Sequence, residues 1–583
     1  MGFLSETSFR FVNRFFTGSM LILGLQGCGN SNGIDIPKEI SRVTGELTAK
    51  NQANILLVSV SSIDEKQVTF TFENDRPVDA PAVVVQNVDW DSDVWQATVN
   101  FVDGTSLSLG ALGSPVSFEV LPLPGDRANK FPLVRNVSFE VPHPGFVRYL
   151  VAGKYDKSSN FEYTTEALNR GSHEIDVLGL YGNWDNRITL EYLSETGYIR
   201  STVTLQVLTT EPEFQIPIYQ WRQANEQDQQ RFYLHGHRAP SCNRQIYIFD
   251  QFGDIRWMVK DISNYAIQQI STGELLFVSD GTAAFTIMTL NGERHDKYFL
   301  PAPFTSIHHD VEEVSPTQFL LTVNDSRKGT IEDVVVLFDT DLQEVTRVWD
   351  LEEVLPKSYE FINDPDDWFH MNAISFDSRD RSLLLSGQRY GLVKLSWDGE
   401  LVWIISDPKR FQAHLNDNRY ADKIFNSYDE DYFTWGQHDV EVDPTSGFIY
   451  VFDNGLGRDY SNVNEYSRGV LFEVDEIERS FGVKSEYGSS FDEYFSPIIS
   501  GLDSSDSRVL LNYGSTAYNF NYIDNYNWVD RQNFRVIPTE YGAALMEFSK
   551  EDGSVISEVT ISCLDDNNWD AGIYRIEYVD LLN

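Results

Sequence analysis

The sequence predicts an all-β fold, with a six-bladed β-propeller over residues 213–583 preceded by one or two β-sandwich domains. Three observations lead to this prediction. A unit made of an apolar strand, a turn rich in Asp and Gly, and a second strand returns six times after about residue 213. Short runs with alternating apolar residues occupy much of the chain before it. Histidines recur at the start of apolar strands in three of the six units.

The size and charge of the chain limit what it can do. At 583 residues it is too long for one ordinary domain, and its 41% hydrophobic content is sufficient for large cores. The formal net charge of −43 gives a surface that repels nucleic acid and anionic membrane faces. An anionic substrate must therefore meet local positive charge at its site.

The N-terminus is typical of an export signal. A basic start precedes a short apolar run over 15–25, and Leu25-Gln26-Gly27-Cys28 resembles a bacterial lipobox. We expect residues 1–27 to be a signal peptide, Cys28 to carry the lipid and residues 28–33 to form a polar tether. The expected location is the periplasm or the outer membrane, with membrane contact only through this anchor. A plain cleaved signal peptide and an uncleaved anchor are the alternatives.

Two β modules are predicted before the propeller. Residues 34–115 contain strand-like runs such as the one over 54–60, and they form an N-terminal β domain to which we assign no role. Residues 116–212 contain similar runs over 145–151 and 202–207, and they form a β-sandwich domain.

The repeat after residue 213 predicts the propeller. Its first clear unit is Tyr247-Ile248-Phe249-Asp250 with a Gly-containing turn, and the other units begin at Met288, Val336, Val393, Leu471 and Leu545. Six units of about 60 residues each fit blades of four strands with their loops. The period of two within each unit excludes a helical solenoid, and a β-helix would repeat at shorter intervals.

A second repeat places histidines in three blades. His309, His370 and His438 each open a strand that is followed by a turn and a strongly apolar strand, and they are 61 and 68 residues apart. Equivalent positions of successive blades lie at the same height around the axis of a propeller. We therefore expect the three imidazoles to converge at one mouth of the central channel. His308 should point to the opposite face of its strand from His309.

The remaining histidines lack this register. We predict a structural role for His235 and His237, and surface or loop positions for the others, which are His143, His173, His295 and His414.

These residues resemble the bacterial arylsulfate sulfotransferase family. The strings HHD at 308–310, HMN at 370–372, QHD at 437–439 and FDNG at 452–455 carry the likeness, and VLGLYGNWDNRITLEY at 177–192 resembles the N-terminal β-sandwich of that family. The resemblance covers about residues 116–583. It implies a six-bladed propeller that moves a sulfuryl group from a phenolic sulfate ester to a phenol through a sulfohistidine intermediate. It also implies a reaction that uses no nucleotide sulfate donor, no cofactor and no metal.

The resemblance also implies roles for single residues. By motif, His438 takes the position of the nucleophile, His309 and His370 those of the other catalytic histidines, and Asn372 that of the accompanying amide. Asp310 or Asp439 is expected to fix the tautomer of a histidine. The turn in FDNG is expected to be structural.

A catalytic arginine is expected at the end of the strand that follows HMN. Counting from His370 places Gln388 at the position of the family's arginine, with Arg389 one residue later. A slip of one residue in a strand reverses the direction of the side chain, although a bulge can restore it. We assign the catalytic role to Arg389. The expected substrate-binding residues around the mouth are His308, Gln388, Tyr390, Trp435, Tyr513, Ser515 and Thr516.

Other readings of the same residues stay open. Three histidines with nearby aspartates are also compatible with a metal-dependent hydrolase or sulfatase, and a propeller lipoprotein can bind ligands without turnover. Cys242 and Cys563 either form a disulfide between the first and last blades or remain free thiols. The expected partners are a small aromatic sulfate donor and a phenolic acceptor, without nucleic acid; the sequence leaves an oligomer open.

Overall fold

The computed structural model describes residues 116–581 and the backbone of six strands between residues 42 and 112. Within 116–581 the description does not extend to residues 156, 196, 198, 211–216, 225–229, 238–244, 261, 263–265, 279–281, 358–364, 412–414, 416, 418, 430–431, 459–465, 490–493, 522–536 and 563–571. The predictions for the signal segment, Cys28, the tether, Cys242, Cys563, His414 and the side chains of His237, Ser515 and Thr516 lie outside the described residues.

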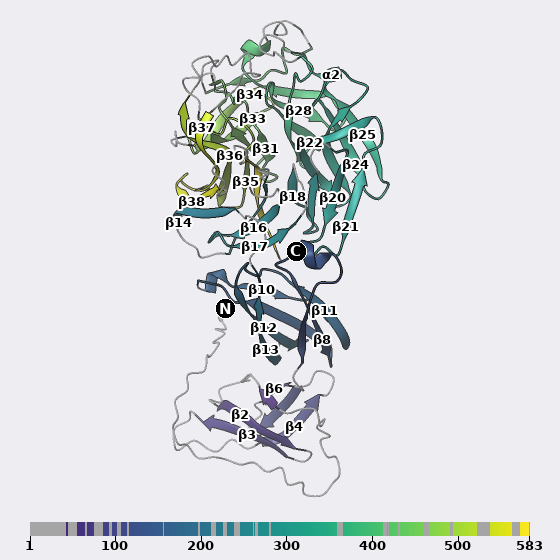
Figure 1. Ribbon diagram of the computed structural model, residues 1–583, viewed down its shortest axis with the longest axis vertical. Helices are drawn as coiled ribbons and strands as arrows, with labels where there is room; N and C mark the ends of the chain where they lie inside the picture. Colours follow the sequence, from purple (N-terminus) through teal and green to yellow (C-terminus); the bar gives the residue numbers. More distant parts are fainter. Residues whose placement is uncertain are drawn as a thin grey trace.

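The first strands form two small antiparallel sheets at one end of the molecule (Figure 1). One sheet pairs β2 (Ile55–Asp64) with β3 (Gln67–Asn74). The other has the order β1-β6-β5-β4. Its members are β1 (Arg42–Thr44), β4 (Val85–Asp91), β5 (Gln96–Phe101) and β6 (Ser106–Leu112).

A β-sandwich follows, as the alternating sequence predicts. One sheet contains β7 (Phe118–Leu121), β8 (Arg135–Val141) and β11 (Gly171–Val177), and the other contains β9 (Gly145–Val151), β10 (Phe161–Thr164), β12 (Asp185–Ser194) and β13 (Ile199–Leu208). Along β9, Val147, Tyr149 and Val151 are buried while their neighbours are partly exposed. Successive side chains point to opposite faces of a strand, and the apolar face therefore becomes the core.

Six further sheets form the propeller, which confirms the predicted fold class. Blade I contains β39 (Ile573–Val579), β15 (Phe232–His237), β16 (Ile246–Asp250) and β17 (Ile255–Val259), and blade II contains β18 (Ile267–Gln269), β19 (Leu275–Val278), β20 (Ala284–Met288) and β21 (His295–Phe299). Blade III contains β22 (Phe304–Ser315), β23 (Gln318–Asp325), β24 (Val334–Asp339) and β25 (Glu344–Asp350), and blade IV contains β26 (Met371–Asp377), β27 (Ser382–Gly387), β28 (Gly391–Ser396) and β29 (Leu401–Ile405). Blade V contains β31 (Asp439–Val442), β32 (Ile449–Asp453), β33 (Arg468–Asp475), β34 (Ser480–Tyr487) and the short β30 (Asn426–Ser427). Blade VI contains β35 (Gly501–Ser504), β36 (Arg508–Asn521), β37 (Ile537–Ser549), β38 (Val555–Ser562) and β14 (Ile218–Ala224).

The Asp-rich turns of the repeat have a local cause. Asp339 and Asp475 each end the third strand of a blade, and the Oδ1 atom of each accepts hydrogen bonds from two backbone N–H groups of the following turn. Asp250 Oδ1 does the same in blade I. A carboxylate that binds the backbone of its own turn favours the chain reversal between the two outer strands.

Both ends of the propeller sequence are built into its sheets. The C-terminal strand β39 pairs with β15 and is the innermost strand of blade I, whereas the early strand β14 pairs with β38 at the outer edge of blade VI. Closure of a ring in this way leaves few unpaired strand edges. It also carries the side chains of β39 to the central axis.

Acidic side chains join the inner strands of neighbouring blades. Asp310 Oδ2 accepts from the backbone N–H of Ile374, 2.8 Å away, and Asp439 Oδ2 accepts from that of Leu502, 2.9 Å away. Arg575 lies between the two carboxylates, with its guanidinium nitrogens 2.8 Å from an oxygen of each. These contacts fix the inner strands of blades III, IV, V and VI relative to one another and to β39.

The sandwich packs against blades I and II (Figure 1). Phe131 lies 6.0 Å from Trp257 and Phe161 lies 5.8 Å from Phe232, measured between ring centroids. The buried Arg256 of blade I donates to the carbonyl of Gly179 at 2.7 Å. One hydrophobic cluster thus continues from the sandwich into the propeller.

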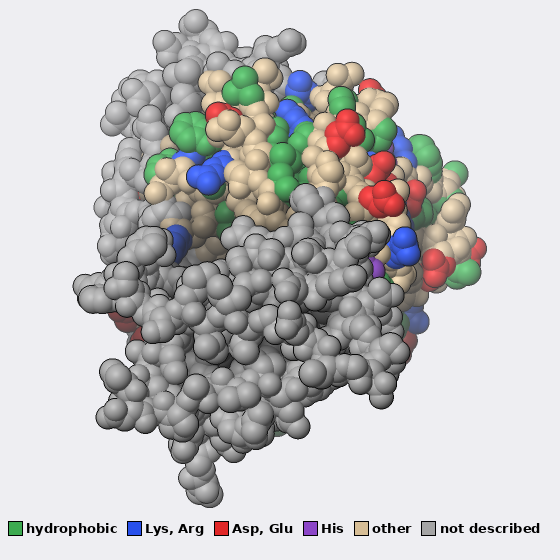
Figure 2. Space-filling view, turned by 90° about the horizontal axis from the view of Figure 1, so that it is seen from below, with side chains coloured by type: hydrophobic (Ala, Val, Ile, Leu, Met, Phe, Trp, Pro, Cys, Tyr) green, Lys and Arg blue, Asp and Glu red, His purple; other side chains and the backbone are tan. Residues whose placement is uncertain are grey.

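The described surface is mixed in charge. In the view of Figure 2, Asp and Glu side chains gather toward one side of the described face, with Lys and Arg side chains among them. The helices are short, as in α1 (Arg127–Lys130) and α2 (Leu351–Val354). Over the residues that the structure describes, no helix has the length and apolar character needed to cross a bilayer.

Candidate active site

The structure brings the three histidines of the repeat together at one end of the channel. His309 lies within β22, His370 directly precedes β26, and His438 directly precedes β31. The ring centroids of His309 and His370 are 5.2 Å apart. The ring of Tyr574 lies 5.9 Å from that of His309 and 6.5 Å from that of His438. The rings therefore surround one small volume, as the register of the sequence predicts.

His438 is the most deeply buried of the three, with 3% of its surface exposed. Its Nδ1 lies 2.9 Å from Asn454 Oδ1 and 3.1 Å from the carbonyl oxygen of Gly436. Both atoms are acceptors, so Nδ1 carries the hydrogen and Nε2 carries the lone pair. Burial lowers the pKa of His438 to about 3, although the hydrogen bond with Asn454 acts in the opposite direction. The ring is therefore neutral at ordinary pH.

Asn454 is a site residue that the sequence analysis missed. Its Nδ2 donates to the carbonyl oxygens of Ser496 and Ile499, at 2.7 and 2.9 Å. These two bonds fix the orientation of the amide and leave Oδ1 directed at His438. Its place in the FDNG motif, which the sequence analysis assigned to a structural turn, was the signal that could have identified Asn454 as a site residue. The structural role holds for Asp453, which accepts from the backbone of Trp435 and pairs with Arg458.

His370 is held by two carboxylates. Its Nδ1 lies 2.8 Å from Asp367 Oδ2 and 2.9 Å from Glu332 Oε2. Burial lowers the pKa of His370, but the contacts with Asp367 and Glu332 outweigh this effect and bring the pKa to about 9. His370 is thus an imidazolium at neutral pH. Asp367 lies three residues before His370, a local signal that the sequence analysis passed over, whereas nothing in the sequence marks Glu332.

Arg389 reaches the site through Asp367. Its Nη2 lies 2.9 Å from Asp367 Oδ2, and its Nη1 donates to the Asp367 carbonyl oxygen at 2.6 Å. Strand β27 ends at Gly387, so Gln388 and Arg389 lie in the following turn, where the alternation of a strand does not apply. Gln388 is buried, and its backbone N–H donates to the carbonyl of His370 at 2.9 Å.

His309 is bonded to the C-terminal strand. Its Nδ1 lies 3.0 Å from the hydroxyl oxygen of Tyr574, and that hydroxyl donates to the carbonyl oxygen of Asn372 at 3.1 Å. Its Nε2 lies 3.3 Å from Glu332 Oε2. Burial raises the pKa of Glu332, but the contacts with His309 and His370 more than offset this and lower it below its usual value. Tyr574 is far away in sequence and was not predicted.

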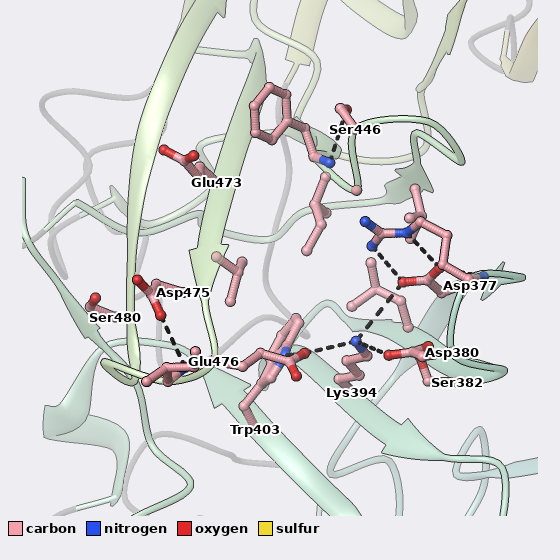
Figure 3. Close-up of a pocket in the computed structure, with 18 of the residues that line it drawn as sticks. Asp377, Asp380, Ser382, Lys394, Trp403, Ser446, Glu473, Asp475, Glu476 and Ser480 are labelled. Carbon is pink, nitrogen blue, oxygen red and sulfur yellow. Dashed lines mark hydrogen bonds and ion pairs between the residues drawn. The ribbon is translucent and has the colours of Figure 1, made fainter.

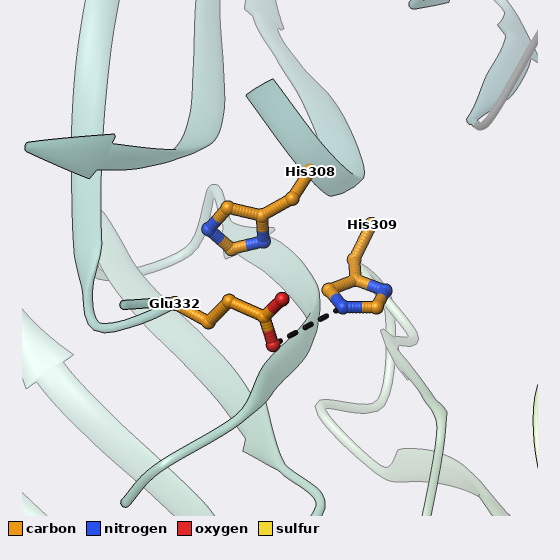
Figure 4. A group of neighbouring side chains, drawn as sticks. All are labelled: His308, His309 and Glu332. Carbon is orange, nitrogen blue, oxygen red and sulfur yellow. Dashed lines mark ion pairs between the residues drawn. The ribbon is translucent and has the colours of Figure 1, made fainter. Parts of the chain in front are cut away.

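The prediction that His308 points away from His309 is wrong. The pairing of β22 with β23 shifts register between Ile307 and Val311, and His309 has a φ of +50°, in the left-handed region. The irregular backbone removes the strict alternation of a strand. His308 and His309 therefore both approach the carboxylate of Glu332, as Figure 4 shows. Burial lowers the pKa of His308 to about 3.

Asn372 lies behind the His438 segment. Its Nδ2 donates to the carbonyl oxygen of Gln437 at 2.7 Å, and its Oδ1 accepts from the hydroxyl of Ser386 at 3.1 Å. The side chain is fully buried. Asn372 thus connects blade IV to the residue before the predicted nucleophile.

Two predicted substrate-binding aromatics belong to the core. Tyr390 is fully buried among Trp368, Phe369 and Phe411, and its hydroxyl donates to the carbonyl of Pro356. Tyr513 is fully buried in the core between blades V and VI. Aromatic residues in apolar segments fill cores more often than they line sites.

The other predicted rim residues are also placed differently. Trp435 is 4% exposed. The guanidinium carbon of Arg410 lies over its indole ring, 5.0 Å from the ring centroid. The segment that contains the predicted residues Ser515 and Thr516 is part of strand β36, which has an irregular register with β37 there. The backbone of Ser515 and Thr516 therefore lies in a sheet.

Asp310 and Asp439 do not fix a histidine tautomer. They bind Arg575 and the backbone of the next blade, as described above, and Asn454 and Asp367 contact the rings instead. Of the remaining histidines, His235 is buried and hydrogen-bonded to the hydroxyl of Tyr219 at 2.6 Å, which fits its predicted structural role. His143 is partly buried in a turn, His173 is partly buried in β11, and His295 is exposed at the start of β21.

A hollow of about 640 Å³ lies away from these histidines, between blades IV and V (Figure 3). Within it, Lys394 Nζ lies 2.6 Å from Asp380 Oδ2 and 2.7 Å from Glu476 Oε1. Trp403 Nε1 donates to the same Glu476 oxygen at 3.1 Å. Its charged groups bind one another, and no histidine lines it, so the candidate site remains at the channel mouth.

Comparisons with known proteins identify the family of the chain. Residues 218–575 match the family model described as Arylsulfotransferase (ASST), and residues 128–210 match the Arylsulfotransferase Ig-like domain. The arylsulfate sulfotransferase AssT of Escherichia coli O6:H1 is 25% identical over 308 residues, which cover 47% of this chain and 49% of that protein. The protein of the same name from Lelliottia amnigena is 26% identical over 215 residues, 33% of this chain and 35% of that protein. The chain thus matches about half or less of the length of these curated relatives.

Solved structures give a weaker likeness. A protein of unknown function from Bacteroides thetaiotaomicron has a TM-score of 0.31 and 12% identity, over 77% of this chain and 98% of that one. Virginiamycin B lyase from Staphylococcus aureus has a TM-score of 0.30 and 9% identity, over 59% of this chain and 99% of that one. Scores of this size carry no argument about function. The match over 218–575 spans more than half of the sequence, and the chain therefore belongs to the arylsulfotransferase family.

Proposed function

We propose that the protein is an arylsulfate sulfotransferase that moves a sulfuryl group from a phenolic sulfate ester to a phenol through a sulfohistidine at His438. The observation that carries this proposal is the state of His438. The ring is buried and neutral, and its Nδ1–H is held by Asn454 and Gly436, so that the lone pair is on Nε2. A neutral imidazole of fixed tautomer is a competent nucleophile. Family membership and the names of the two curated relatives support the same reaction.

In the first half-reaction, Nε2 of His438 attacks sulfur and the bond from sulfur to the phenolic oxygen breaks. The ring gains a positive charge that balances the transferred sulfonate, and the phenolate leaves with the electron pair. The Nδ1–H bond to Asn454 then becomes a charge-assisted hydrogen bond, which is stronger than the bond in the resting enzyme. Asn454 thus stabilises the transition state more than the ground state, which is the requirement for acceleration.

The departing phenolate needs a proton. His370 carries one, with Nδ1 held by Asp367 and Glu332, so Nε2 is the nitrogen that donates to a ligand. Proton transfer from His370 to the phenolate gives the phenol product and a neutral imidazole. In the second half-reaction that imidazole takes the proton of the acceptor phenol, whose oxygen attacks sulfur and releases His438. Protons and charge balance over the cycle without a further reactant.

The proposal is tested with p-nitrophenyl sulfate as donor. Mixed without acceptor, the protein should release a burst of nitrophenol that leaves a sulfuryl group on a His438 peptide, detected by mass spectrometry. Addition of phenol should sustain the release. His438→Ala should abolish both signals, and His295→Ala, at an exposed histidine outside the site, should leave both unchanged. Sustained release by His438→Ala would rule out the assigned nucleophile. Release that needs only water would indicate a sulfatase.

A further inference from the structure

Arg575 of strand β39 joins the two aspartates that follow site histidines in the sequence. Asp310 follows His309, and Asp439 follows His438. The Nη1 atom of Arg575 lies 2.8 Å from Asp310 Oδ1, and its Nη2 atom lies 2.8 Å from Asp439 Oδ1. One guanidinium group thus connects the segment of the predicted nucleophile to the segment of a second histidine of the site.

The two carboxylates are bound in the same way. Oδ1 of each also accepts from the backbone N–H of the next residue of its own strand, Val311 or Val440, 2.9 Å away. Oδ2 of each accepts from a backbone N–H of the neighbouring blade, as described above. Each carboxylate is therefore held against the backbone next to its histidine, and its position and that of the histidine change together.

The arginine reaches across the axis of the propeller. Its strand belongs to blade I, whereas Asp310 and Asp439 belong to blades III and V. In a ring of six blades, blade I faces blade IV, and blades III and V lie on either side of blade IV. Blades III and V are not neighbours, so no strand pairing fixes the distance between them. The planar fork of an arginine can fix it, because its two Nη groups have a constant spacing.

Charge and packing both favour this position of the guanidinium. Asp310 and Asp439 are buried, and two buried carboxylates repel each other unless a cation lies between them. Glu577 Oε1 adds a third acidic group 3.8 Å from Nη1 of Arg575. The inner strand of blade VI approaches closely at Gly501, where an added Cβ would lie 2.6 Å from Asp439 Oδ2 and 2.9 Å from Arg575 Cγ. A side chain at Gly501 would therefore displace both groups.

We propose that Arg575 is a positioning residue that sets the separation of His309 and His438 for sulfuryl transfer. This role rests on the proposed function, and it acts through Asp310 and Asp439 without contact with the reacting atoms. An error of about 1 Å in the placement of reacting groups lowers a rate by about 10²-fold. A smaller shift of blade III relative to blade V should already slow the first half-reaction, although every side chain of the site is still present.

The variant Arg575→Lys separates the charge of the arginine from its fork. A lysine keeps the positive charge, but its ammonium is a point charge on a flexible stem and does not hold two carboxylates at a constant spacing. With p-nitrophenyl sulfate, the nitrophenol burst rate at saturating donor should fall at least about tenfold at full amplitude. The half-saturating donor concentration should stay within about twofold, because Arg575 does not bind the donor. Gly501→Ala, which keeps every charge, should lower the burst rate in the same way.

Arg256→Lys is the matched control. Arg256 is also fully buried, its Nη1 lies 2.9 Å from Asp250 Oδ2, and it donates to the carbonyl of Gly179 at 2.7 Å. These contacts lie between blade I and the sandwich, away from the histidines. Arg256→Lys should therefore keep the parent burst rate. Thermal melts verify that each variant is folded at the assay temperature.

Ring ¹⁵N spectra of histidine-labelled protein give a second measurement that needs no turnover. The ring signals of His309 and His438, assigned by their loss in the two alanine variants, should move in Arg575→Lys and stay in place in Arg256→Lys. A parent burst rate in Arg575→Lys, an equal loss of rate in Arg256→Lys, or unmoved ring signals overturns the proposal. Absence of nitrophenol release from the parent protein rejects the proposed function, and the ring signals then decide alone whether Arg575 aligns the two histidines.

Discussion

Asn454→Ala should slow formation of the sulfohistidine. The substitution removes the acceptor that lies 2.9 Å from Nδ1 of His438. A hydrogen bond between neutral groups contributes about 1 kcal/mol, and one to a charged group about 2 kcal/mol. The difference of about 1 kcal/mol is lost from the transition state, which corresponds to roughly a fivefold lower rate. The Gly436 carbonyl, 3.1 Å from Nδ1, still favours the same tautomer, so the loss should not exceed this value.

The same substitution also weakens the fold, and the assay must separate the two effects. Asn454 Nδ2 satisfies the carbonyls of Ser496 and Ile499, and their loss should lower the free energy of unfolding by about 2–4 kcal/mol. Asn186→Ala is a matched control. That buried side chain bonds the backbone of Tyr181 and Trp184 in the sandwich, far from His438.

The measurement is a rapid-mixing burst of nitrophenol from p-nitrophenyl sulfate without acceptor, well below the melting temperature of each variant. The burst amplitude counts folded sites and the burst rate reports the first half-reaction. Asn454→Ala should have a lower rate at full amplitude, and Asn186→Ala should keep the parent rate. A rate for Asn454→Ala within twofold of the parent, or an equal loss in both variants, would refute the orienting role of Asn454.

Three further predictions concern pH and packing. Because burial lowers the pKa of His438 to about 3, the burst rate at pH 5 should stay within about twofold of that at pH 7. A histidine of ordinary pKa would be only about 3% neutral at pH 5. A burst rate that falls in proportion to that neutral fraction would contradict the burial argument. Tyr574→Phe should lower kcat roughly fivefold, because it removes the hydroxyl that holds His309. Tyr578→Phe, on the same strand, loses a hydrogen bond to Glu547 and should keep the parent kcat. Equal kcat values in the two variants would argue against the role of Tyr574. Burial raises the pKa of Glu312 to about 8, so the folded protein keeps a proton that the unfolded chain releases above 4.5, and the stability from this group falls as pH rises from 4.5 to 8. Glu312→Gln should therefore raise the free energy of unfolding in urea by about 1–3 kcal/mol at pH 8 and leave it nearly unchanged at pH 4.5, and an identical effect at both values would count against this linkage.

Periodic patterns in the sequence were sufficient for the fold and for the histidine register. The strand repeat with its Asp-containing turns predicts the blades, because turn capping and alternating burial are local effects. The spacing of His309, His370 and His438 predicts their convergence, because equivalent strands of a closed ring bring equivalent residues to one height.

The aromatic residues expected at the mouth show where such patterns fail. Tyr390 and Tyr513 lie near the motifs in sequence, yet both are in blade cores. Proximity in sequence does not decide which face of a strand is apolar. The prediction for His308 failed for a related reason. The irregular register at 307–311 turns its side chain to the side of His309, opposite to the expected one.

The sequence by itself determined the propeller and the three histidines that gather at its axis. Only the tertiary structure decided what surrounds them: Glu332 between two imidazoles, Asn454 behind His438, and Tyr574 delivered by the last strand. The physical reason is sequence distance. Tyr574 bonds a histidine 265 residues earlier in the chain, and a contact of that range exists only after the ring has closed.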